Sequence, residues 1–539
     1  MNTAARIQYV TTLGDLLKSH VGADMLAPCA GLAVQGMQLD SRQVKPGDVF
    51  FALFGKNHDA RDYIDVAVGN GAVAVVADAG GRWQGLSWIG TVPVFAISGL
   101  RSQLGEIAAG FYQHPSQHMA VVGVTGTNGK TSCTQFIAQI LNALGQSCGV
   151  VGTLGYGVYP ELKDTGFTTP DPLALQAALA DLRDHRAATV AMEASSQGLH
   201  QHRLKAVEFH TAVFTNLTRD HLDYHGTMQA YAEAKRRLFE TPGLKVGVVN
   251  MDDSHAAVML NALPRCARSL TFSVSNRLAD VCARNVHYRV DGFDLELSTP
   301  WGDGAIHSEL LGAFNVSNVL AAVTAVMTLP AAYPLSDVLA AVTAVMTLPA
   351  AYPLSDVLAA ASALKAVNGR MAVVGSVDGM TAVVDYAHTP DGLRSALEAV
   401  RQHASGKVWC VFGCGGNRDQ GKRPLMAEVA EALADHVIVT DDNPRLENAD
   451  DIVRQIMLGF GQRDTVIVER DRAKAIALAI AGAGAGDVVL VAGKGHENYQ
   501  DIGGHRMAFS DASHVRLALQ QRKHPGTVLA DADKDGGSL

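Results

Sequence analysis

Residues 119–132, MAVVGVTGTNGKTS, decide how this chain folds. An apolar run of strand length leads into a glycine-rich turn, then into Lys130 and Thr131, and then into a helix that we predict over Cys133–Leu144. Glycines let backbone N–H groups approach phosphate oxygens, the lysine supplies a cation, and the threonine hydroxyl can bind Mg²⁺. An ordinary glycine turn is the alternative, but it does not explain the adjacent lysine and threonine. The stretch therefore predicts a site for nucleotide phosphates.

Apolar runs of strand length alternate with helix-length segments on both sides of this loop. We predict strands at Met119–Val124, Ala188–Met192, Ala212–Phe214, Val246–Val249, Val408–Phe412, Val437–Thr440 and Val488–Val491. This alternation is typical of βαβ units with mainly parallel sheets. A chain of 539 residues is too long for one compact core, since domains average about 150 residues. We predict an α/β protein of three domains over residues 1–117, 118–366 and 367–525. The polar tail, 526–539, is expected to be disordered.

The composition excludes several classes of protein. Hydrophobic residues make up 48% and charged residues 18%, which argues against a disordered chain. A net charge of −9 argues against a protein that binds the phosphate backbone of nucleic acids non-specifically. The seven cysteines are odd in number and form no C-x-x-C pair, which favours a reducing compartment. The N-terminus lacks the pattern of a signal peptide, and the most apolar stretch, 319–335, is interrupted by Pro330. We therefore expect a cytoplasmic protein without membrane insertion.

One segment is repeated without change. Residues 319–337, VLAAVTAVMTLPAAYPLSD, recur as residues 338–356. Two copies are too few for a solenoid, so a recent duplication or an assembly error explains the identity better than a repeat architecture does. Each copy predicts a helix of about three turns, a loop bounded by prolines, and a Ser-Asp N-cap of the next helix. We predict a surplus helix that bulges out, or a strained rearrangement.

Polar residues follow two of the predicted strands. Glu193 comes directly after Ala188–Met192, and His221 lies in the segment after Ala212–Phe214. Ligands of doubly wound sheets collect at the carboxyl ends of the strands, where a carboxylate and an imidazole could help to hold the metal that a triphosphate requires. Taken alone, Glu193 could cap a helix and His221 could be an ordinary surface histidine. Their shared position after strand ends favours a functional role.

The loop T-G-T-N-G-K-T after an apolar strand resembles the Mur ligase family, the ATP-dependent amide-forming enzymes of peptidoglycan precursor synthesis. It is a variant of the general phosphate loop, because Val124 stands where the first glycine is usual. Folylpolyglutamate synthases share the architecture. Residues 442–445, D-N-P-R, and 493–497, G-K-G-H-E, resemble the branch of the family that adds meso-diaminopimelate. A guanidinium can clamp the extra carboxylate of that amino acid, which L-lysine lacks. The alternative for D-N-P-R is a plain turn.

The resemblance implies a central P-loop-type, doubly wound ATP-binding domain, an N-terminal α/β domain that binds UDP, and a C-terminal Rossmann-like domain. It implies catalytic roles for Lys130, Glu193, His221 and Lys235. It implies Mg²⁺ ligands at Thr131, Glu193, His221 and Lys235, the last as N6-carboxylysine formed with CO₂. It implies ATP contacts from Gly126, Thr127, Asn128, Gly129, Lys130, Thr131, Ser132, Asn315, Asn318, Arg370, Asp385 and His388.

The same resemblance implies two further binding sites. Contacts to UDP-MurNAc-L-Ala-D-Glu would come from Leu39, Ser41, Lys56, Asn57, His58, Thr168, Thr169, Ser195, Gln201 and Arg203. Contacts to meso-diaminopimelate would come from Arg418, Asp442, Asn443, Pro444, Arg445, Gly493 and Glu497. The implied enzyme is a monomeric ATP-dependent acid–amino-acid ligase that works through an acyl phosphate. The rivals are a ligase of the same fold that adds L-lysine, a folylpolyglutamate synthase, and a P-loop protein that binds nucleotide without catalysis.

Overall fold

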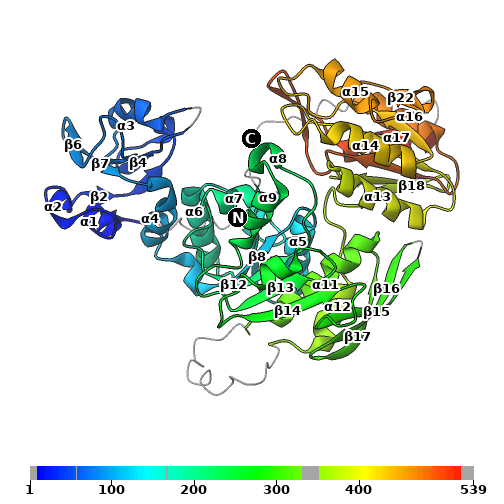
Figure 1. Cartoon of the computed structure of the whole chain (residues 1–539), viewed down its shortest axis with the longest axis horizontal. Helices are drawn as coiled ribbons and strands as arrows, with labels where there is room; N and C mark the ends of the chain where they lie inside the picture. The colour runs from blue at the N-terminus through cyan, green and yellow to red at the C-terminus, as the bar shows by residue number, and fades with distance from the viewer. Residues whose placement is uncertain (1–8, 56–57, 164–167, 290, 331–350, 524–539) are drawn as a thin grey trace.

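A computed structural model describes residues 9–55, 58–163, 168–289, 291–330 and 351–523. The chain forms three α/β units, each built on its own sheet, and the first and last units lie on opposite sides of the middle one (Figure 1). This arrangement confirms the predicted α/β class. The bounds of the three domains stay a prediction. Among the described helices, none is both long and apolar enough to cross a bilayer.

The first unit contains a five-stranded sheet in the order β3-β4-β5-β7-β6, in which β6 alone runs antiparallel to its neighbour. Its strands are β3 (Gly36–Gln38), β4 (Asp48–Ala52), β5 (Ala74–Asp78), β6 (Leu86–Ile89) and β7 (Val92–Ile97), with the pair β1 (Thr11–Thr12) and β2 (Ala33–Val34) beside them. Its helices are α1 (Leu13–Leu17), α2 (Ala23–Leu26), α3 (Ile64–Gly69) and α4 (Leu104–Phe111). Phe50 and Phe51 point into cores on opposite faces of the sheet, because successive side chains of a strand alternate.

The middle unit contains a ten-stranded sheet in the order β10-β9-β11-β8-β12-β13-β14-β15-β16-β17. Its strands are β8 (Ala120–Thr125), β9 (Cys148–Gly152), β10 (Gly155–Val158), β11 (Thr189–Glu193), β12 (Phe209–Phe214), β13 (Val246–Asn250), β14 (Arg268–Ser273), β15 (Val281–Arg289), β16 (Gly292–Thr299) and β17 (Gly302–Ser308). The run from β9 to β15 is parallel, and β10, β16 and β17 are antiparallel additions at the two edges. The connections from β8 lead to β9 on one side and, through β11, to β12 on the other, which opens a crevice at the carboxyl end of β8.

Helices cover both faces of the middle sheet. They are α5 (Lys130–Ala143), α6 (Pro172–Asp184), α7 (Ser196–His200), α8 (Leu222–His225), α9 (Met228–Arg236), α10 (Ala256–Leu260), α11 (Ala313–Met327) and α12 (Leu354–Ser362). Helices α5, α11 and α12 share one apolar core, and α6, α9 and α10 contribute to a second core on the other face. The predicted strands read as continuous apolar runs because both of their faces are buried in this way.

The third unit contains a six-stranded sheet in the order β18-β19-β23-β20-β21-β22. Its strands are β18 (Ala372–Val377), β19 (Met380–Asp385), β20 (Val408–Phe412), β21 (His436–Val439), β22 (Ile467–Val468) and β23 (Val488–Ala492), and a separate hairpin is formed by β24 (Tyr499–Ile502) and β25 (His505–Ala508). Its helices are α13 (Pro390–His403), α14 (Lys422–Leu433), α15 (Ala449–Met457), α16 (Arg472–Gly482) and α17 (Asp511–Lys523). Short 3₁₀ helices lie at Ser41–Gln43, Ala60–Tyr63, Leu100–Ser102, Pro115–His118 and Arg463–Thr465.

Each predicted strand overlaps an observed one, but two predicted helix starts are wrong. Helix α5 begins at Lys130 and not at Cys133, because the end of the phosphate loop is itself the first helical turn. Helix α12 begins at Leu354 with Pro353 at its N-cap position, so Ser355 and Asp356 lie inside the helix and do not cap it. Aspartate is favourable in a first turn as well as at a cap, because the helix N-terminus carries partial positive charge.

The two copies of the repeat contribute different halves to the core. Residues 319–327 of the first copy form the second half of α11. Tyr352 and Leu354 of the second copy, just before and at the start of α12, pack in the same core. The surplus helix predicted between them falls on residues 331–350, which lie outside the described residues. Because the copies are identical, residues 319–330 and 351–356 together supply almost one whole repeat to the packed structure.

We expect deletion of residues 338–356 to preserve or raise both the melting temperature and the activity. Deleting 331–349 yields the same protein, so every packed residue type survives the change. A shorter connection between α11 and α12 also lowers the entropy cost of bringing the two helices together. Calorimetry and an ADP-release assay on both forms check this, and a fall in melting temperature with loss of activity would contradict it.

Candidate active site

A cavity of about 740 Å³ lies between the phosphate-loop end of the middle sheet and the third unit. Lys130, Glu193, His221 and Lys235, which the sequence analysis assigned to catalysis, all line it. They come from α5, from the end of β11, from the segment before α8 and from α9. Further lining residues of the predicted site are Thr127, Asn128, Gly129, Thr131, Ser132, Thr168, Thr169, Ser195, Arg203, Asn318, Arg370, Asp385, His388 and Arg418. The cavity therefore brings together the predicted nucleotide and acceptor residues.

The phosphate loop is held in a shape that only glycine fits at two positions. Gly126 has a φ of +156°, and a Cβ there would lie 1.8 Å from Thr215 Oγ1. Gly129 has a φ of +84°, and a Cβ there would lie 2.5 Å from Asn318 Oδ1. No side chain caps the N-terminus of α5. Its first backbone N–H groups and its positive dipole end are thus available to an anion in the cavity.

Lys130 lies over the loop that precedes it. Its Nζ donates to the carbonyl oxygens of Gly126 at 2.9 Å and Thr127 at 2.8 Å. Burial lowers the pKa of Lys130, and the negative charges of Glu193 and Asp220 oppose that shift. A cation held in this way can move to a phosphate oxygen through a short displacement of its side chain.

Glu193 is fixed by two threonines. Its Oε1 accepts from Thr131 Oγ1 at 3.0 Å and from the backbone N–H of Thr153 at 2.8 Å, and its Oε2 accepts from Thr153 Oγ1 at 3.1 Å. Thr153 Oγ1 also lies 3.0 Å from Thr168 Oγ1, on the predicted acceptor side. The sequence analysis missed Thr153. Its signal was its position directly after β9, a third strand end at the same edge of the sheet.

Lys235 is buried, although composition alone suggests a solvated helix lysine. Its Nζ donates to Gly126 O at 2.6 Å and lies 4.4 Å from the centre of the Tyr231 ring. Burial holds the pKa of Lys235 well below its usual value, and the nearby charge of Lys130 adds to the effect. A lowered pKa favours the neutral form of the amine, which is the nucleophilic form.

His221 stands beside the two lysines with its backbone in the left-handed region at a φ of +52°. Burial lowers the pKa of His221, and Lys130 and Lys235 lower it further against the attraction of Asp220. Its Nε2 lies 3.4 Å from Asp220 Oδ2. Asp220 also lines the cavity and was missed from the sequence, where its signal was the adjacent histidine.

The donor set fits a magnesium ion that shares its coordination with phosphate. Within the described ranges, no three His, Cys, Asp or Glu side chains are grouped so that they could hold a metal by themselves. The Thr131 hydroxyl and the Glu193 carboxylate meet at 3.0 Å. Mg²⁺ commonly takes one or two protein oxygens, waters and substrate phosphates. Carbamylation of Lys235 would add a second carboxylate beside His221.

The third unit touches the phosphate loop directly. Arg370 Nη2 donates to Thr131 Oγ1 at 3.2 Å, and Asn128 Nδ2 donates to Asp391 Oδ2 at 3.1 Å. Burial lowers the pKa of His388 to about 4, and its Nδ1 lies 2.7 Å from Tyr386 O. Burial raises the pKa of Asp385, which accepts from the backbone N–H groups of Met371 and Ala387.

Two predicted nucleotide contacts do not line the cavity. Gly126, in the phosphate loop, faces Thr215, which directly follows β12. Asn315 is buried at the start of α11. Asn315 donates to Leu311 O at 2.8 Å and accepts from Asn318 Nδ2 at 3.2 Å. Asn315 thus supports Asn318, which does reach the cavity.

The predicted acceptor residues divide between two units. Arg203 lines the cavity, donates to Thr169 O at 2.8 Å and donates to Gln201 Oε1 at 3.0 Å, so Gln201 stands behind Arg203. Leu39, Ser41 and His58 belong to the first unit and do not line this cavity. Lys56 and Asn57 lie outside the described residues.

Arg418 lines the cavity, and the other residues predicted to bind the amino acid do not. Arg445 Nη1 donates at 2.9 Å to the carbonyl of Gly416, in the loop that carries Arg418. Arg445 has a φ of +55°. Its backbone is held by the hairpin of β24 and β25, because Arg445 N donates to Asp501 O and Gly503 N donates to Arg445 O.

The sequence analysis missed Lys494, which ties two of those residues together. Its buried Nζ donates to Asn443 Oδ1 and to Glu497 Oε2, both at 3.0 Å. Asn443 Nδ2 donates to the same Glu497 oxygen at 2.8 Å. These bonds hold Asn443 and Glu497 together through Lys494.

Comparison with known proteins identifies the family of this chain. Residues 33–112 match the Mur ligase family catalytic domain, 124–326 the Mur ligase middle domain, and 369–495 the glutamate ligase domain. A relative from Pseudomonas syringae pv. tomato is 48% identical over 486 residues, which cover 90% of this chain and 95% of the relative. It is named UDP-N-acetylmuramoyl-L-alanyl-D-glutamate--2,6-diaminopimelate ligase. The chain belongs to the Mur ligase family.

Further relatives agree with this placement. A protein of the same name from Coxiella burnetii is 43% identical over 510 residues, covering 94% of this Mur ligase and 100% of the relative. A solved structure of a ligase with that name is 36% identical and has a TM-score of 0.66, with 96% of this Mur ligase and 100% of that chain covered. A Mur ligase from Thermotoga maritima, solved in complex with ADP, is 20% identical with a TM-score of 0.59 over 90% of this chain and 98% of its own, and shares the fold.

We expect the substitution Thr153→Val to weaken Mg²⁺ binding, so that the MgCl₂ concentration needed for half-maximal ADP release rises about tenfold. The change removes the hydroxyl that donates to Glu193 Oε2, and a hydrogen bond to a charged group contributes about 1.5–3 kcal/mol. ADP release titrated with MgCl₂ measures the shift. Thr324→Val, in α11, is the matched control, because its buried hydroxyl bonds to Leu320 O away from the cavity. An unchanged Mg²⁺ titration for Thr153→Val would show that the bond is dispensable.

Proposed function

We propose that this Mur ligase uses ATP to join meso-diaminopimelate to the D-Glu carboxylate of UDP-N-acetylmuramoyl-L-alanyl-D-glutamate. Relatives that are 43–48% identical over about nine-tenths of the chain carry the name of this activity. The observation that carries the proposal is a single cavity that holds Lys130 and the Thr131–Glu193 pair together with Thr168, Ser195 and Arg203. A phosphate donor and a carboxylate acceptor can thus meet in one place.

The reaction needs ATP because a carboxylate does not react with an amine directly at neutral pH. The D-Glu carboxylate attacks the γ-phosphorus of ATP, and the bond from that phosphorus to the β–γ bridging oxygen breaks. ADP departs, and the acceptor becomes an acyl phosphate. Lys130 and the N-terminus of α5 stabilise the charge on the transferring phosphoryl group. Thr131 and Glu193 would hold one Mg²⁺ ion, and His221 and carbamylated Lys235 would hold a second. Bound there, the ions would neutralise the charge of the triphosphate.

The amine of diaminopimelate then attacks the acyl carbon, and the tetrahedral intermediate expels phosphate. Arg203 orients the acid, since its guanidinium is fixed by Thr169 and Gln201. Arg418 and Arg445 orient the amino acid through its carboxylates, with Asp442, Asn443, Pro444, Gly493 and Glu497 around them. Arg370 and Asp391 bring the third unit against the phosphate loop, and closure of that unit over bound substrates would exclude water from the acyl phosphate.

The first unit takes the distal part of the acceptor. The UDP group would be bound by the residues that the family resemblance implies, Leu39, Ser41, Lys56, Asn57 and His58. The acceptor would then span from that unit to the cavity. Because both ATP and a UDP-sugar are intracellular metabolites, we expect the reaction to take place in the cytoplasm, and we expect the enzyme to act as a monomer.

An ADP-release assay with purified protein tests the proposal. ADP should form only when ATP, Mg²⁺, the UDP-linked dipeptide and diaminopimelate are all present. Preference for L-lysine, or for glutamate and a folate, in the same single-turnover assay would assign the chain to another ligase of this fold. ADP release that stays independent of the amino acid would favour a nucleotide-binding protein without ligase activity.

We expect Arg445→Leu to raise the KM for diaminopimelate about a hundredfold and to leave the KM for ATP unchanged. A guanidinium that clamps a carboxylate is lost, and breaking such a charged pair costs about 2–5 kcal/mol. Steady-state ADP release measures both constants. Arg454→Leu is the matched control, because this exposed arginine on α15 pairs with Asp451 at the surface and does not line the cavity. An unaltered KM for diaminopimelate would remove Arg445 from the site.

A further inference from the structure

The short helix α8 connects two sides of the active-site cavity. It begins directly after His221, which lines the cavity and which the proposed function assigns to a metal ion. Its last two residues, Tyr224 and His225, both contact α7, the helix on the acceptor side (Figure 1). Neither Tyr224 nor His225 lines the cavity. The reaction described so far gives these two side chains no part.

Tyr224 and His225 hold the two ends of α7. His225 Nε2 lies 2.9 Å from the hydroxyl of Ser196, the first residue of that helix. The Tyr224 hydroxyl lies 2.9 Å from Nδ1 of His200, the last residue, and accepts at 3.0 Å from Nε2 of Gln201, which follows it. A helix of five residues has little stability of its own in water, so contacts from outside fix where its ends lie.

The side-chain amide of Gln201 fits in only one orientation. One of its atoms lies 3.0 Å from Arg203 Nε and 2.6 Å from Arg203 Nη2, and a guanidinium has donors but no acceptor. The atom that faces Arg203 must therefore be the amide oxygen, so the amide nitrogen faces the other way. Tyr224 supplies the oxygen that accepts from this nitrogen. A phenylalanine in place of Tyr224 would remove that bond.

The orientation of Gln201 decides which edge of Arg203 faces the cavity. Gln201 takes the side formed by Nε and Nη2, and Nη1 donates to Thr169 O at 2.8 Å. Among the described residues, these contacts use three of the five N–H groups of the guanidinium. The remaining two belong to Nη1 and Nη2, and together they form an edge that can bind a carboxylate through two bonds. Arg203 itself lines the cavity.

We propose that Tyr224 is a positioning residue for the acceptor substrate, acting through Gln201 on Arg203. Its hydroxyl fixes the Gln201 amide, and the amide turns the free edge of the guanidinium toward the acid of the acceptor. The inference rests on the proposed function, because it concerns a carboxylate of the UDP-linked dipeptide. Since Tyr224 does not line the cavity, its effect is confined to the substrate that Arg203 orients.

Tyr224→Phe removes the hydroxyl and keeps the ring. Loss of one hydrogen bond between neutral groups should raise the KM for the UDP-linked dipeptide about three- to tenfold. The KM values for ATP and diaminopimelate, and kcat, should stay within about twofold of the parent. Because Tyr224 is 40% exposed, the variant should fold like the parent, which thermal melting checks. Steady-state ADP release measures the constants.

Three results of that assay would overturn the proposal. One is an unchanged KM for the dipeptide in the folded variant. Another is an equal rise of all three KM values, which would indicate general disturbance of the cavity. The third is a change confined to the MgCl₂ requirement, because Tyr224 would then act through the neighbouring His221 and not through Gln201.

A double-mutant cycle with Gln201→Ala tests the route from Tyr224 to Arg203. Once the amide is absent, the Tyr224 hydroxyl has nothing to position. Adding Tyr224→Phe to Gln201→Ala should therefore change the KM for the dipeptide by less than about twofold further. If the two effects multiply instead, Tyr224 acts on the acceptor independently of Gln201, and the proposal is wrong.

Direct binding of the UDP-linked dipeptide separates failure of this inference from failure of the proposed function. Calorimetric titration requires no catalysis, and Tyr224→Phe should weaken binding by the same factor by which it raises the KM. If the parent protein does not bind the dipeptide, the proposed function fails and this inference falls with it. If the parent binds the dipeptide and the variant binds it equally well, only the role of Tyr224 is refuted.

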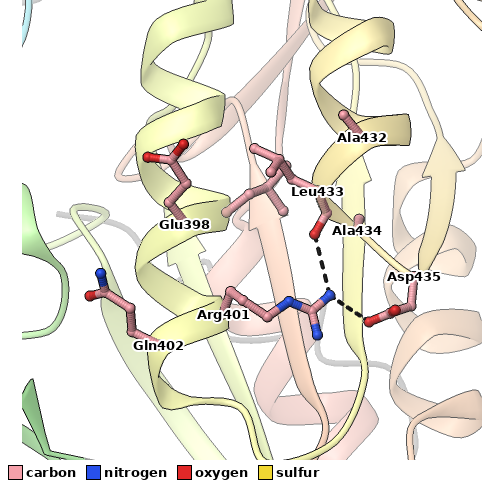
Figure 2. A pocket seen from close by; sticks show the side chains of 8 residues that line it. Glu398, Arg401, Gln402, Ala432, Leu433, Ala434 and Asp435 are labelled. Carbon is pink, nitrogen blue, oxygen red and sulfur yellow. Dashed lines mark hydrogen bonds and ion pairs between the residues drawn. The ribbon is translucent and has the colours of Figure 1, made fainter.

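Two substitutions away from α7 supply matched controls. Tyr288→Phe, on β15, removes the hydroxyl of a half-buried tyrosine that does not line the cavity. Arg401→Gln, on α13, breaks a surface pair with Asp435 beside a shallow pocket at the end of α14, as Figure 2 shows. Neither change should alter the KM for the dipeptide. A comparable rise in either control would attribute the effect to general loosening and would refute the proposal.

Discussion

Lys130→Gln should lower the rate of ADP formation by about 10²–10³-fold. Lys130 lines the same cavity as Glu193. Its Nζ donates to the loop carbonyl oxygens of Gly126 at 2.9 Å and Thr127 at 2.8 Å. Removing one preorganised group that stabilises developing charge commonly costs that factor in kcat. Glutamine retains a donor for the loop carbonyls, so the fold should persist. Single-turnover ADP formation at saturating substrates measures the loss.

Lys245→Gln provides the matched control for this substitution. Lys245 is exposed on the same unit, directly before β13 and away from the cavity. Its variant should keep the parent rate. If Lys130→Gln kept more than about a tenth of the parent rate, the phosphate loop would not be the site of phosphoryl transfer, and the proposed function would lose its main support.

Lys235→Ala should abolish most activity, and short carboxylates such as acetate should restore part of it. The side chain is buried and its pKa is held low, so the amine can add to CO₂ and form a carbamate with loss of a proton. Alanine leaves space in which a small carboxylate can stand for that group. We expect a loss of about a hundredfold, comparable to the loss of other charge-stabilising groups. ADP release with and without added carboxylate measures both effects.

Lys235→Arg separates carbamylation from simple positive charge. Arginine keeps a cation but does not form the carbamate, so it should be inactive and should not respond to acetate. Intact mass spectrometry under mild conditions should show one added CO₂ on the parent protein and none on either variant. Full activity of Lys235→Ala without carboxylate would contradict the assignment.

Much of the fold could be predicted because its signals are local. Strands buried on both faces read as continuous apolar runs, so β8, β20 and β23 were found to within a residue at either end. The phosphate loop and its helix also follow from neighbouring residues. The start of α5 was misplaced because the loop and the helix share Lys130 and Thr131.

The candidate site was predictable only where strand order brings residues together. Glu193 follows from its strand end, whereas Thr153 lies 40 residues away in sequence and joins Glu193 only in the folded sheet. Lys235 entered through family resemblance, since nothing in its neighbourhood indicates burial. Tyr224 and Gln201 are 23 residues apart, and Lys494 reaches Asn443 across 51. Such contacts depend on how α7, α8 and the segment after β23 pack, which no local pattern records.

The bonds of the third unit to the phosphate loop bear on how fast nucleotide is captured. Arg370 and Asp391 hold Thr131 and Asn128, the same groups that phosphate oxygens must reach. We therefore expect ATP capture to require that those two bonds open. If this movement of the third unit limits the rate, capture should saturate at high ATP and slow in viscous solvent.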